Sequence, residues 1–199
     1  LFTPLDEITQ FDNIPNLVAY YNSRLYYKHK NQELQIFHGH LCVTEYVNDC
    51  KAIIEALTEL SKEGIGNYTN SVESWLEKSA YQIDSEEKKT ALCEMFSASR
   101  VAFIYGAAGT GKSTMLNHIS NFFAQKRKLY VAHTNPAVDN MRRRVIVDKS
   151  EFKTISKIVC DSRNREDCDI LFIDECSTVS NADMRKLLEQ VSFKLLVLV

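Results

Sequence analysis

The chain has 199 residues, of which 45% are hydrophobic and 25% charged, and this composition excludes a disordered or low-complexity protein. The formal charge is -2, but residues 1–100 carry nine Lys and Arg against 15 Asp and Glu, whereas residues 101–199 carry 15 against 11. We therefore expect any polyanion to bind the second half.

The sequence also predicts the cellular compartment of the protein and whether the chain is a piece of a longer one. No apolar run approaches the roughly 18 residues of a membrane span, and no signal peptide precedes the six cysteines, so we expect a cytoplasmic protein with reduced thiols. The chain begins at Leu1 rather than at methionine and ends in a strand-like run, KLLVLV. We expect it to be a piece of a longer protein.

Residues 1–80 are expected to form a mostly helical accessory region. Apolar residues from Val43 to Leu60 recur at spacings of three and one, which predicts one continuous helix that ends at Gly64. The run LQIFH at 34–38 predicts a short strand.

Two further helices are expected in this region. The run SVESWLEKSA predicts a short helix from residue 71, and PNLVAYYNSRLYYKHK predicts another over 15–30. We expect its tyrosines to pack on a neighbouring domain, although aromatic residues interleaved with basic ones are also typical of proteins that bind single-stranded nucleic acid.

The pattern changes near residue 81. Asp84 with Glu87 three residues later resembles a capping box, so a helix should run from there to about Ser97. Beyond it, apolar strands alternate with helices: strands at 101–105, 128–133, 169–174 and 194–199, and helices near 112–125, 136–144 and 181–190. This alternation predicts an α/β domain over 81–199, with a parallel sheet covered by helices on both faces.

The stretch GAAGTGKST, between the first of these strands and its helix, has the spacing of a phosphate-binding loop. Its backbone N–H groups would surround phosphate oxygens at a helix N-terminus, whereas the bland alternative is a glycine-rich turn with an incidental lysine. Lys112 would reach the β and γ phosphates of ATP, and the Ser113 hydroxyl would coordinate Mg²⁺. The residues expected to bind the nucleotide are Gly106, Gly109, Thr110, Gly111, Lys112, Ser113 and Thr114.

An acidic pair in ILFIDEC ends the strand at 169–174, where open α/β sheets bind their ligands. Asp174 would hold Mg²⁺ through its water shell, and Glu175 would orient and deprotonate the attacking water. In isolation such a pair is commonly a solvated strand end. With the loop upstream, it predicts a catalytic centre made of Lys112, Asp174 and Glu175.

The stretch TNPAVDNMRRR narrows the function. Asn135 followed by Pro136 predicts a helix start, so that Thr134 and Asn135 lie beyond a strand end and could hold a nucleic-acid phosphate. The three arginines at 142–144 lie about 100° apart on a helix and cannot all face one ligand. A diffuse positive field, domain contacts, or complementation of the helix dipole would each explain them.

Together, GAAGTGKST, TNPAVDNM, FKTISK and DECS resemble motifs I, Ia, Ib and II of superfamily 1 helicases, in the RecD-like and Upf-like branch. The resemblance covers about residues 84–199. It implies a first RecA-like motor domain of the P-loop NTPase class, which binds single-stranded DNA or RNA and couples ATP hydrolysis to translocation, with 5′ to 3′ polarity expected. It also places Thr154, in FKTISK, beside Thr134 and Asn135 as a nucleic-acid contact.

Departures from the family pattern qualify this expectation. Family members carry a glutamine that reads adenine about 17 residues before the loop, where this chain has Lys88-Lys89-Thr90. The Gly-Asp-x-x-Gln motif III, and the second RecA-like domain with its arginine fingers, would follow Val199. We therefore expect little or no hydrolysis by this chain alone.

Two other classes of protein remain open. An AAA-type ATPase that remodels proteins would share the phosphate loop and the acidic pair, but would not require the helix start at TNPAVDN. A nucleotide-dependent switch would bind ATP without turnover stimulated by a nucleic-acid strand.

Overall fold

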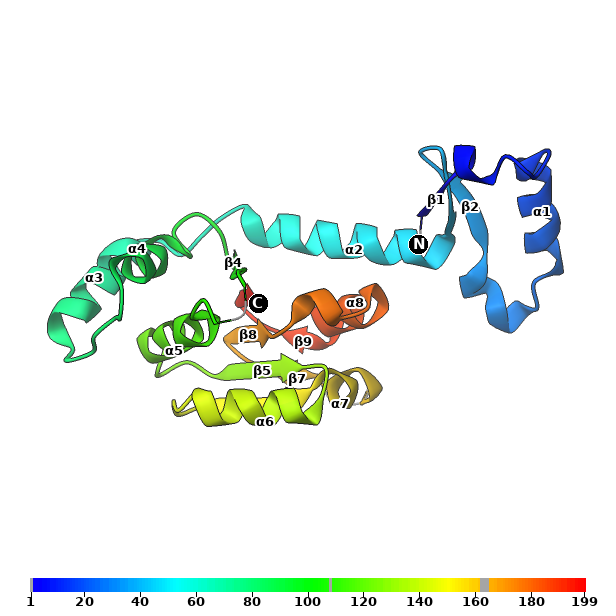
Figure 1. Cartoon of the computed structure of the whole chain (residues 1–199). Helices are drawn as coiled ribbons and strands as arrows, with labels where there is room; N and C mark the ends of the chain where they lie inside the picture. Colours follow the sequence, from blue (N-terminus) through cyan, green and yellow to red (C-terminus); the bar gives the residue numbers. More distant parts are fainter. Residues whose placement is uncertain (1, 108, 162–164) are drawn as a thin grey trace. The chain divides into compact units, whose positions relative to one another are not determined.

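The computed structural model describes residues 2–107, 109–161 and 165–199, and it divides into two compact units, Leu1–Ile54 and Glu55–Val199. The division falls inside helix α2 (Thr44–Ser61), the long cyan helix of Figure 1. No helix among these residues is both long enough and apolar enough to cross a membrane.

The first unit holds a three-stranded antiparallel sheet in the order β1 (Phe2–Pro4), β3 (His40–Val43), β2 (Leu34–Phe37). The turn between β2 and β3 has positive φ at both central residues, 49° at His38 and 74° at Gly39, as a two-residue hairpin requires. The sequence pattern predicted β2, but it missed its partner β3, because this turn was not recognised, and it also missed β1, which pairs with β3.

Helix α1 (Ile14–Arg24) ends earlier than expected, and the 3-10 segments η1 (Leu5–Ile8) and η2 (Tyr27–Gln32) complete the first unit. Within this unit four tyrosines are exposed, between 41% and 67%: Tyr20, Tyr21, Tyr26 and Tyr27. The guanidinium of Arg24 lies over the Tyr20 ring, 4.9 Å from its centre.

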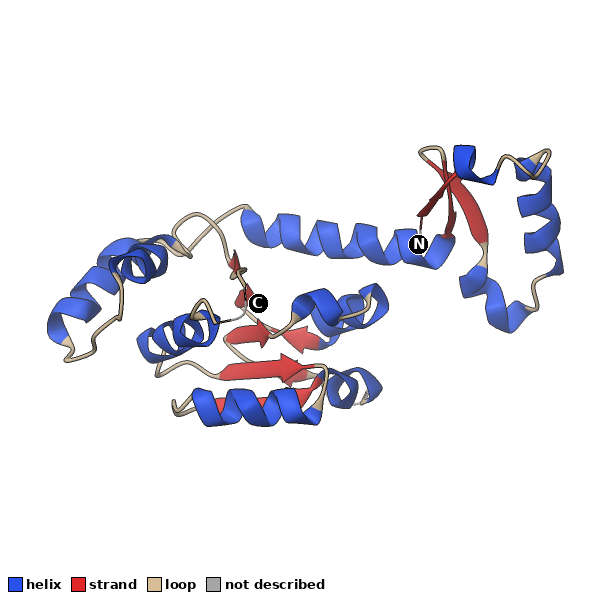
Figure 2. Ribbon diagram, viewed as in Figure 1, coloured by secondary structure: helices blue, strands red, loops and turns tan. Residues whose placement is uncertain are grey.

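The second unit contains a five-stranded parallel sheet, drawn in red in Figure 2. Its order is β4 (Val101–Phe103), β10 (Leu195–Leu198), β8 (Ile170–Ile173), β5 (Lys128–Ala132), β6 (Ser150–Thr154), and all four pairings are parallel. The α/β fold class is therefore confirmed. The short strands β7 (Glu166–Asp167) and β9 (Val191–Ser192) form a separate parallel pair.

Both faces of this sheet are buried, because alternate residues of each strand point to opposite sides. Tyr130 and Phe172 pack toward helices α3 (Tyr68–Lys78), α4 (Glu86–Glu94), α5 (Lys112–Phe122) and α6 (Asn135–Arg144). Leu171 and Ile173 pack toward helices α7 (Ile155–Cys160) and α8 (Asn181–Gln190) and the end of α2. The second unit thus includes α3, which the sequence pattern placed in the accessory region, since Tyr68 and Val72 complete its core.

Two helix starts differ from those predicted. Helix α4 is capped by Ser85, whose Oγ accepts from the Lys88 N–H, and not by Asp84. Helix α6 is capped by Thr134, whose Oγ1 accepts from the Ala137 N–H at 3.3 Å, so Asn135 is already helical. In both cases a hydroxyl one residue away is placed to accept the amide hydrogen bond.

Candidate functional site

The glycine-rich loop joins β4 to α5 and leaves the helix start open to a ligand. Gly109 and Gly111 have φ of 82° and 86°, a conformation that side chains disfavour, and a Cβ on Gly111 would lie 2.8 Å from Lys88 Nζ. No side chain caps α5 at Gly111. The first amides of the helix therefore face an incoming anion, as phosphate binding requires.

Lys112 curls back over this loop. Its Nζ donates to the carbonyl oxygens of Gly106 at 2.7 Å and Ala107 at 3.0 Å, and the Thr110 hydroxyl donates to the Ala107 carbonyl at 2.9 Å. Ala108 lies outside the described residues. The ammonium is thus held at the loop and can exchange carbonyl oxygens for phosphate oxygens.

The acidic pair follows β8 and is fixed by the neighbouring strands. The Asp174 N–H donates to the Val131 carbonyl at 2.9 Å, and the Glu175 N–H donates to Asp174 Oδ1 at 3.1 Å. Burial raises the pKa of the Asp174 carboxyl. Glu175 has φ 51° and ψ 42°, the left-handed conformation that costs a side-chain-bearing residue free energy and occurs frequently at functional sites.

The loop and the acidic pair line one cavity of about 660 Å³, within the size range of ligand pockets. Its lining comes from α5, α6, the loop and the strand ends: Gly109, Gly111, Lys112, Ser113, Thr114, Asn117, Asn140, Arg144, Asp174, Glu175 and Val199. Gly106 lines an adjoining cavity of about 500 Å³, which shares Lys112 and the acidic pair. All the predicted phosphate and metal residues except Thr110 thus line these two cavities, although Lys112 and Asp174 lie more than 60 residues apart in the chain.

These residues fit a magnesium nucleotide. The open N-terminus of α5 and Lys112 suit phosphate oxygens. The Ser113 hydroxyl and the Asp174 carboxylate are hard oxygen donors of the kind that Mg²⁺ prefers. Since Mg²⁺ favours an ionised ligand, it would oppose the effect of burial on the Asp174 carboxyl.

The three residues expected to contact nucleic acid lie outside this cavity, at the ends of adjacent strands. Thr134 follows β5 and Asn135 begins α6, while Thr154 ends β6 and caps α7. The Thr154 Oγ1 accepts from the Lys157 N–H at 3.3 Å, much as Thr134 caps α6. Both threonine hydroxyls are therefore already engaged by helix amides.

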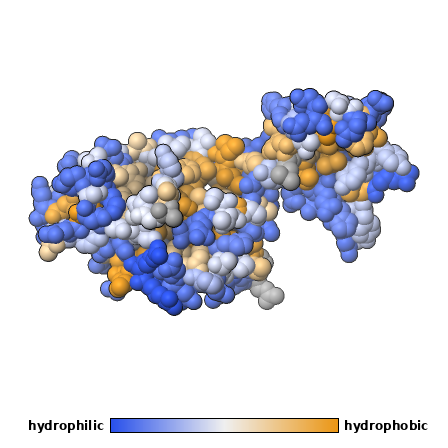
Figure 3. All heavy atoms as spheres, in the orientation of Figure 1, coloured by the Kyte–Doolittle hydropathy of each residue, from blue (hydrophilic) through white to orange (hydrophobic). Residues whose placement is uncertain are grey.

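Arg144 is a cavity residue that the sequence pattern did not single out. Its Nη1 donates to Ser113 Oγ at 2.9 Å. Arg142 turns elsewhere, donating to Asp139 Oδ1 at 2.8 Å and lying over the Phe152 ring. Hydrophilic side chains gather over α6 along the lower edge of this face (Figure 3). The sequence could indicate that consecutive arginines on a helix point in different directions, because each residue turns by about 100°. It could not indicate which arginine faces the cavity.

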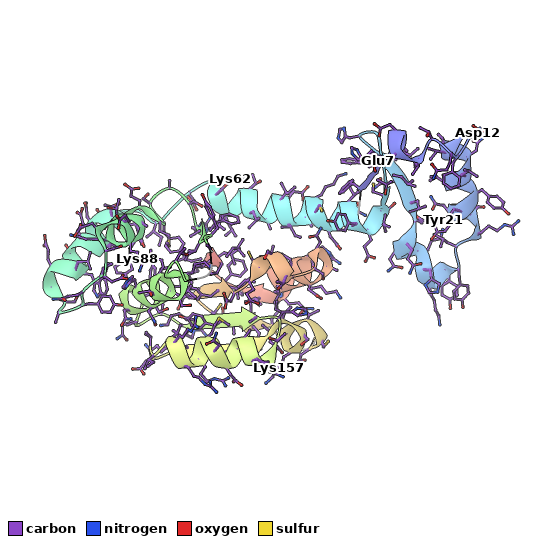
Figure 4. All side chains as sticks on the ribbon, in the orientation of Figure 1. Glu7, Asp12, Tyr21, Lys62, Lys88 and Lys157 are labelled. Atoms are coloured by element: carbon purple, nitrogen blue, oxygen red, sulfur yellow. The ribbon has the colours of Figure 1, made fainter. Side chains whose placement is uncertain are left out.

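Lys88 does not line the cavity, but it lies beside the glycine-rich loop. It lies on α4, where Figure 4 labels it, and its ammonium pairs with Asp84 beside Gly111. The Asp84 carboxylate also accepts from His118 Nε2 at 2.8 Å, which ties the start of α4 to α5. Hydrogen bonds from Lys88 and His118 lower the pKa of Asp84 to about 2.

Comparison with known proteins locates the same segment. A family model described as "AAA domain" matches residues 82–199. No curated protein matches the chain.

Proposed function

The chain belongs to the AAA domain family of P-loop NTPases over residues 82–199, and on this premise we propose that it is the ATP-binding motor of a superfamily 1 helicase or translocase. Its substrate would be MgATP, and its track single-stranded DNA or RNA. A second RecA-like domain beyond this chain is the partner that we propose completes the motor, with the first compact unit, Leu1–Ile54, as an accessory region.

Four residues of the cavity have a role in hydrolysis under this proposal: Lys112, Ser113, Asp174 and Glu175. Lys112 exchanges the carbonyls of Gly106 and Ala107 for phosphate oxygens, and the Ser113 hydroxyl with Asp174 holds Mg²⁺. When bound, the ion neutralises charge on the phosphates.

Glu175 is the proposed base. It orients water and accepts its proton as the water oxygen attacks the γ phosphorus, and the bond to the β–γ bridging oxygen breaks to give ADP and phosphate.

One observation carries the nucleic-acid part of the proposal. Thr134 and Thr154 stand at the carboxyl ends of β5 and β6, which pair in parallel, with Ala132 opposite Thr154. The phosphate loop and the acidic pair follow β4 and β8 of the same parallel sheet. Because parallel strands end on one edge, a strand bound at Thr134, Asn135 and Thr154 would lie beside the nucleotide cavity.

The test is the ATPase rate of the full-length protein, in which this chain would be joined to the second RecA-like domain, with and without single-stranded DNA or RNA, alongside Glu175→Gln. We expect one polymer to stimulate turnover, and Glu175→Gln to remove turnover while leaving nucleotide binding intact. Turnover that is indifferent to both polymers would contradict the proposed track and favour an ATPase that remodels proteins.

If turnover is slow, a binding measurement tests the proposed nucleic-acid interface independently of ATP hydrolysis. In fluorescence anisotropy with a labelled oligonucleotide, we expect Asn135→Ala to weaken binding about tenfold, by loss of a phosphate contact. Asn181→Ala, on α8, is the control and should leave the affinity unchanged. Equal affinities for all three proteins would remove Asn135 from the proposed interface.

A further inference from the structure

Arg144 contacts the group that the proposed mechanism assigns to the metal. Its Nη1 donates to Ser113 Oγ at 2.9 Å, and its side chain lines the phosphate cavity together with Lys112, Asp174 and Glu175. A guanidinium has five N–H donors in a rigid fork, which matches phosphate oxygens. The cavity therefore holds a second cation in addition to the loop lysine.

The backbone of Arg144 is anchored. It is the last residue of α6, and its carbonyl accepts from Asn117 Nδ2 at 2.7 Å, while the following Val145 is 3% exposed and packs in the core. Asn140, one turn earlier on α6, lines the same cavity. The side chain of Arg144 can thus change partners without movement of the helix.

Charge in the cavity favours an anionic partner for Arg144. The charged residues of its lining are Lys112 and Arg144 against Asp174 and Glu175. Without Arg144, one ammonium would face two carboxylates among these side chains, and only Lys112 and a bound Mg²⁺ would offset the charge of a terminal phosphate.

We propose that Arg144 is the residue by which this site distinguishes a nucleoside triphosphate from a diphosphate. Without nucleotide its guanidinium donates to Ser113, and with a triphosphate it donates instead to the terminal phosphate. This inference rests on the proposed nucleotide site, but not on the proposed track. Because α6 runs from Asn135 to Arg144, it also joins the terminal phosphate to the proposed nucleic-acid edge.

The experiment is equilibrium binding by calorimetry of two ligands, the Mg²⁺ complexes of ADP and of the β,γ-imido analogue of ATP. The proteins are the wild-type chain, Arg144→Gln, Arg144→Lys and Arg143→Gln. The Arg143 variant is the matched control, since it removes the same charge from the neighbouring helical position, which does not line the cavity.

We expect Arg144→Gln to weaken binding of the triphosphate analogue about tenfold or more, the effect of losing one charge-assisted hydrogen bond. Binding of ADP should change less than about threefold. Arg144→Lys should recover part of the loss, because it keeps the charge without the fork. Arg143→Gln should change both affinities equally and slightly.

Equal losses for the two ligands, or none, in Arg144→Gln and Arg144→Lys would overturn the role of Arg144 while leaving the nucleotide site standing. If the wild-type chain bound neither ligand, the proposed nucleotide site would fail, and the inference with it. Thermal unfolding of each variant identifies a loss of fold, and Arg144→Lys, which keeps the charge, tests the inference if Arg144→Gln does not fold.

Discussion

At the scale of single residues, two of the three consecutive arginines make different contacts. Arg142 pairs with Asp139 and covers Phe152, whereas Arg144 reaches Ser113 in the cavity. A rotation of about 100° per residue requires such a division. The acceptor that each side chain meets, Asp139 for Arg142 and Ser113 for Arg144, decides which arginine lies in the cavity.

The ionised carboxylate of Asp174 would serve the proposed metal site, but it should lower the stability of the folded protein. Its pKa is raised by burial, so its ionised form destabilises the folded protein, increasingly as the pH rises through the folded-state pKa. We predict that Asp174→Asn raises the melting temperature at pH 7 by about 2 °C, and that the gain vanishes near pH 3, where both side chains are neutral.

The same variant should lose the stabilisation that MgATP gives the wild type. Differential scanning fluorimetry with and without MgATP measures both effects. A lower melting temperature for Asp174→Asn in the absence of ligand would contradict this account.

The ionised carboxylate of Asp84, in contrast, should stabilise the folded protein. Hydrogen bonds from Lys88 and His118 hold its pKa at about 2, below the unfolded value, so its contribution is present above about pH 4 and is lost as the pH falls toward 2. We predict that Asp84→Asn is less stable than the wild type to urea at pH 6, and that the difference shrinks at pH 3. Glu87→Gln, an exposed neighbour, is the control and should show no such trend.

At the scale of elements, α7 depends on its cap and its packing. It has six residues, too few to be stable alone, and it is held by the Thr154 hydroxyl and by buried Ile155 and Ile158. We predict that Thr154→Ala lowers the free energy of unfolding by about 1 kcal/mol, and that Thr154→Ser restores most of it. Equilibrium denaturation of the three proteins measures this, and equal stabilities would show that packing alone holds α7.

The central strands are held by a stack of rings as well as by the backbone. The ring centre of Tyr130 in β5 lies 4.8 Å from that of Phe152 and 4.4 Å from that of Phe172, and the Tyr130 ring is nearly parallel to both. These pairs join β6, β5 and β8, whose ends carry the proposed nucleic-acid residues and the acidic pair. The stack therefore keeps the two groups of strand ends in a fixed relation.

At the scale of the whole molecule, the compact ATPase unit is longer than the family match, which begins at residue 82. Tyr68, 2% exposed, packs edge-on against Phe96 and Phe122, and Val72 is fully buried beside it. These contacts make α3 part of the core of this unit.

We therefore predict that a chain of residues 55–199 unfolds cooperatively. A chain of residues 81–199 should be less stable by about 3–6 kcal/mol, because it loses the burial of at least two large side chains. Urea denaturation followed by circular dichroism compares the two. Equal stabilities would show that α3 is dispensable.

The sequence by itself determined the elements whose cause is local. Apolar runs predicted β4, β5, β8 and β10, and the spacing of glycines, lysine and serine predicted the phosphate loop. These patterns can be read because strand periodicity and turn chemistry depend on neighbours in the chain.

Only the tertiary structure decided contacts between distant segments. It brought Arg144 of α6 to Ser113 of α5, placed Lys88 beside Gly111, and added β6 at the sheet edge, although that strand has no strong apolar pattern. It also showed that α3 packs in the core of the ATPase unit. Such contacts depend on how helices pack on the sheet, and one-dimensional spacing does not contain that information.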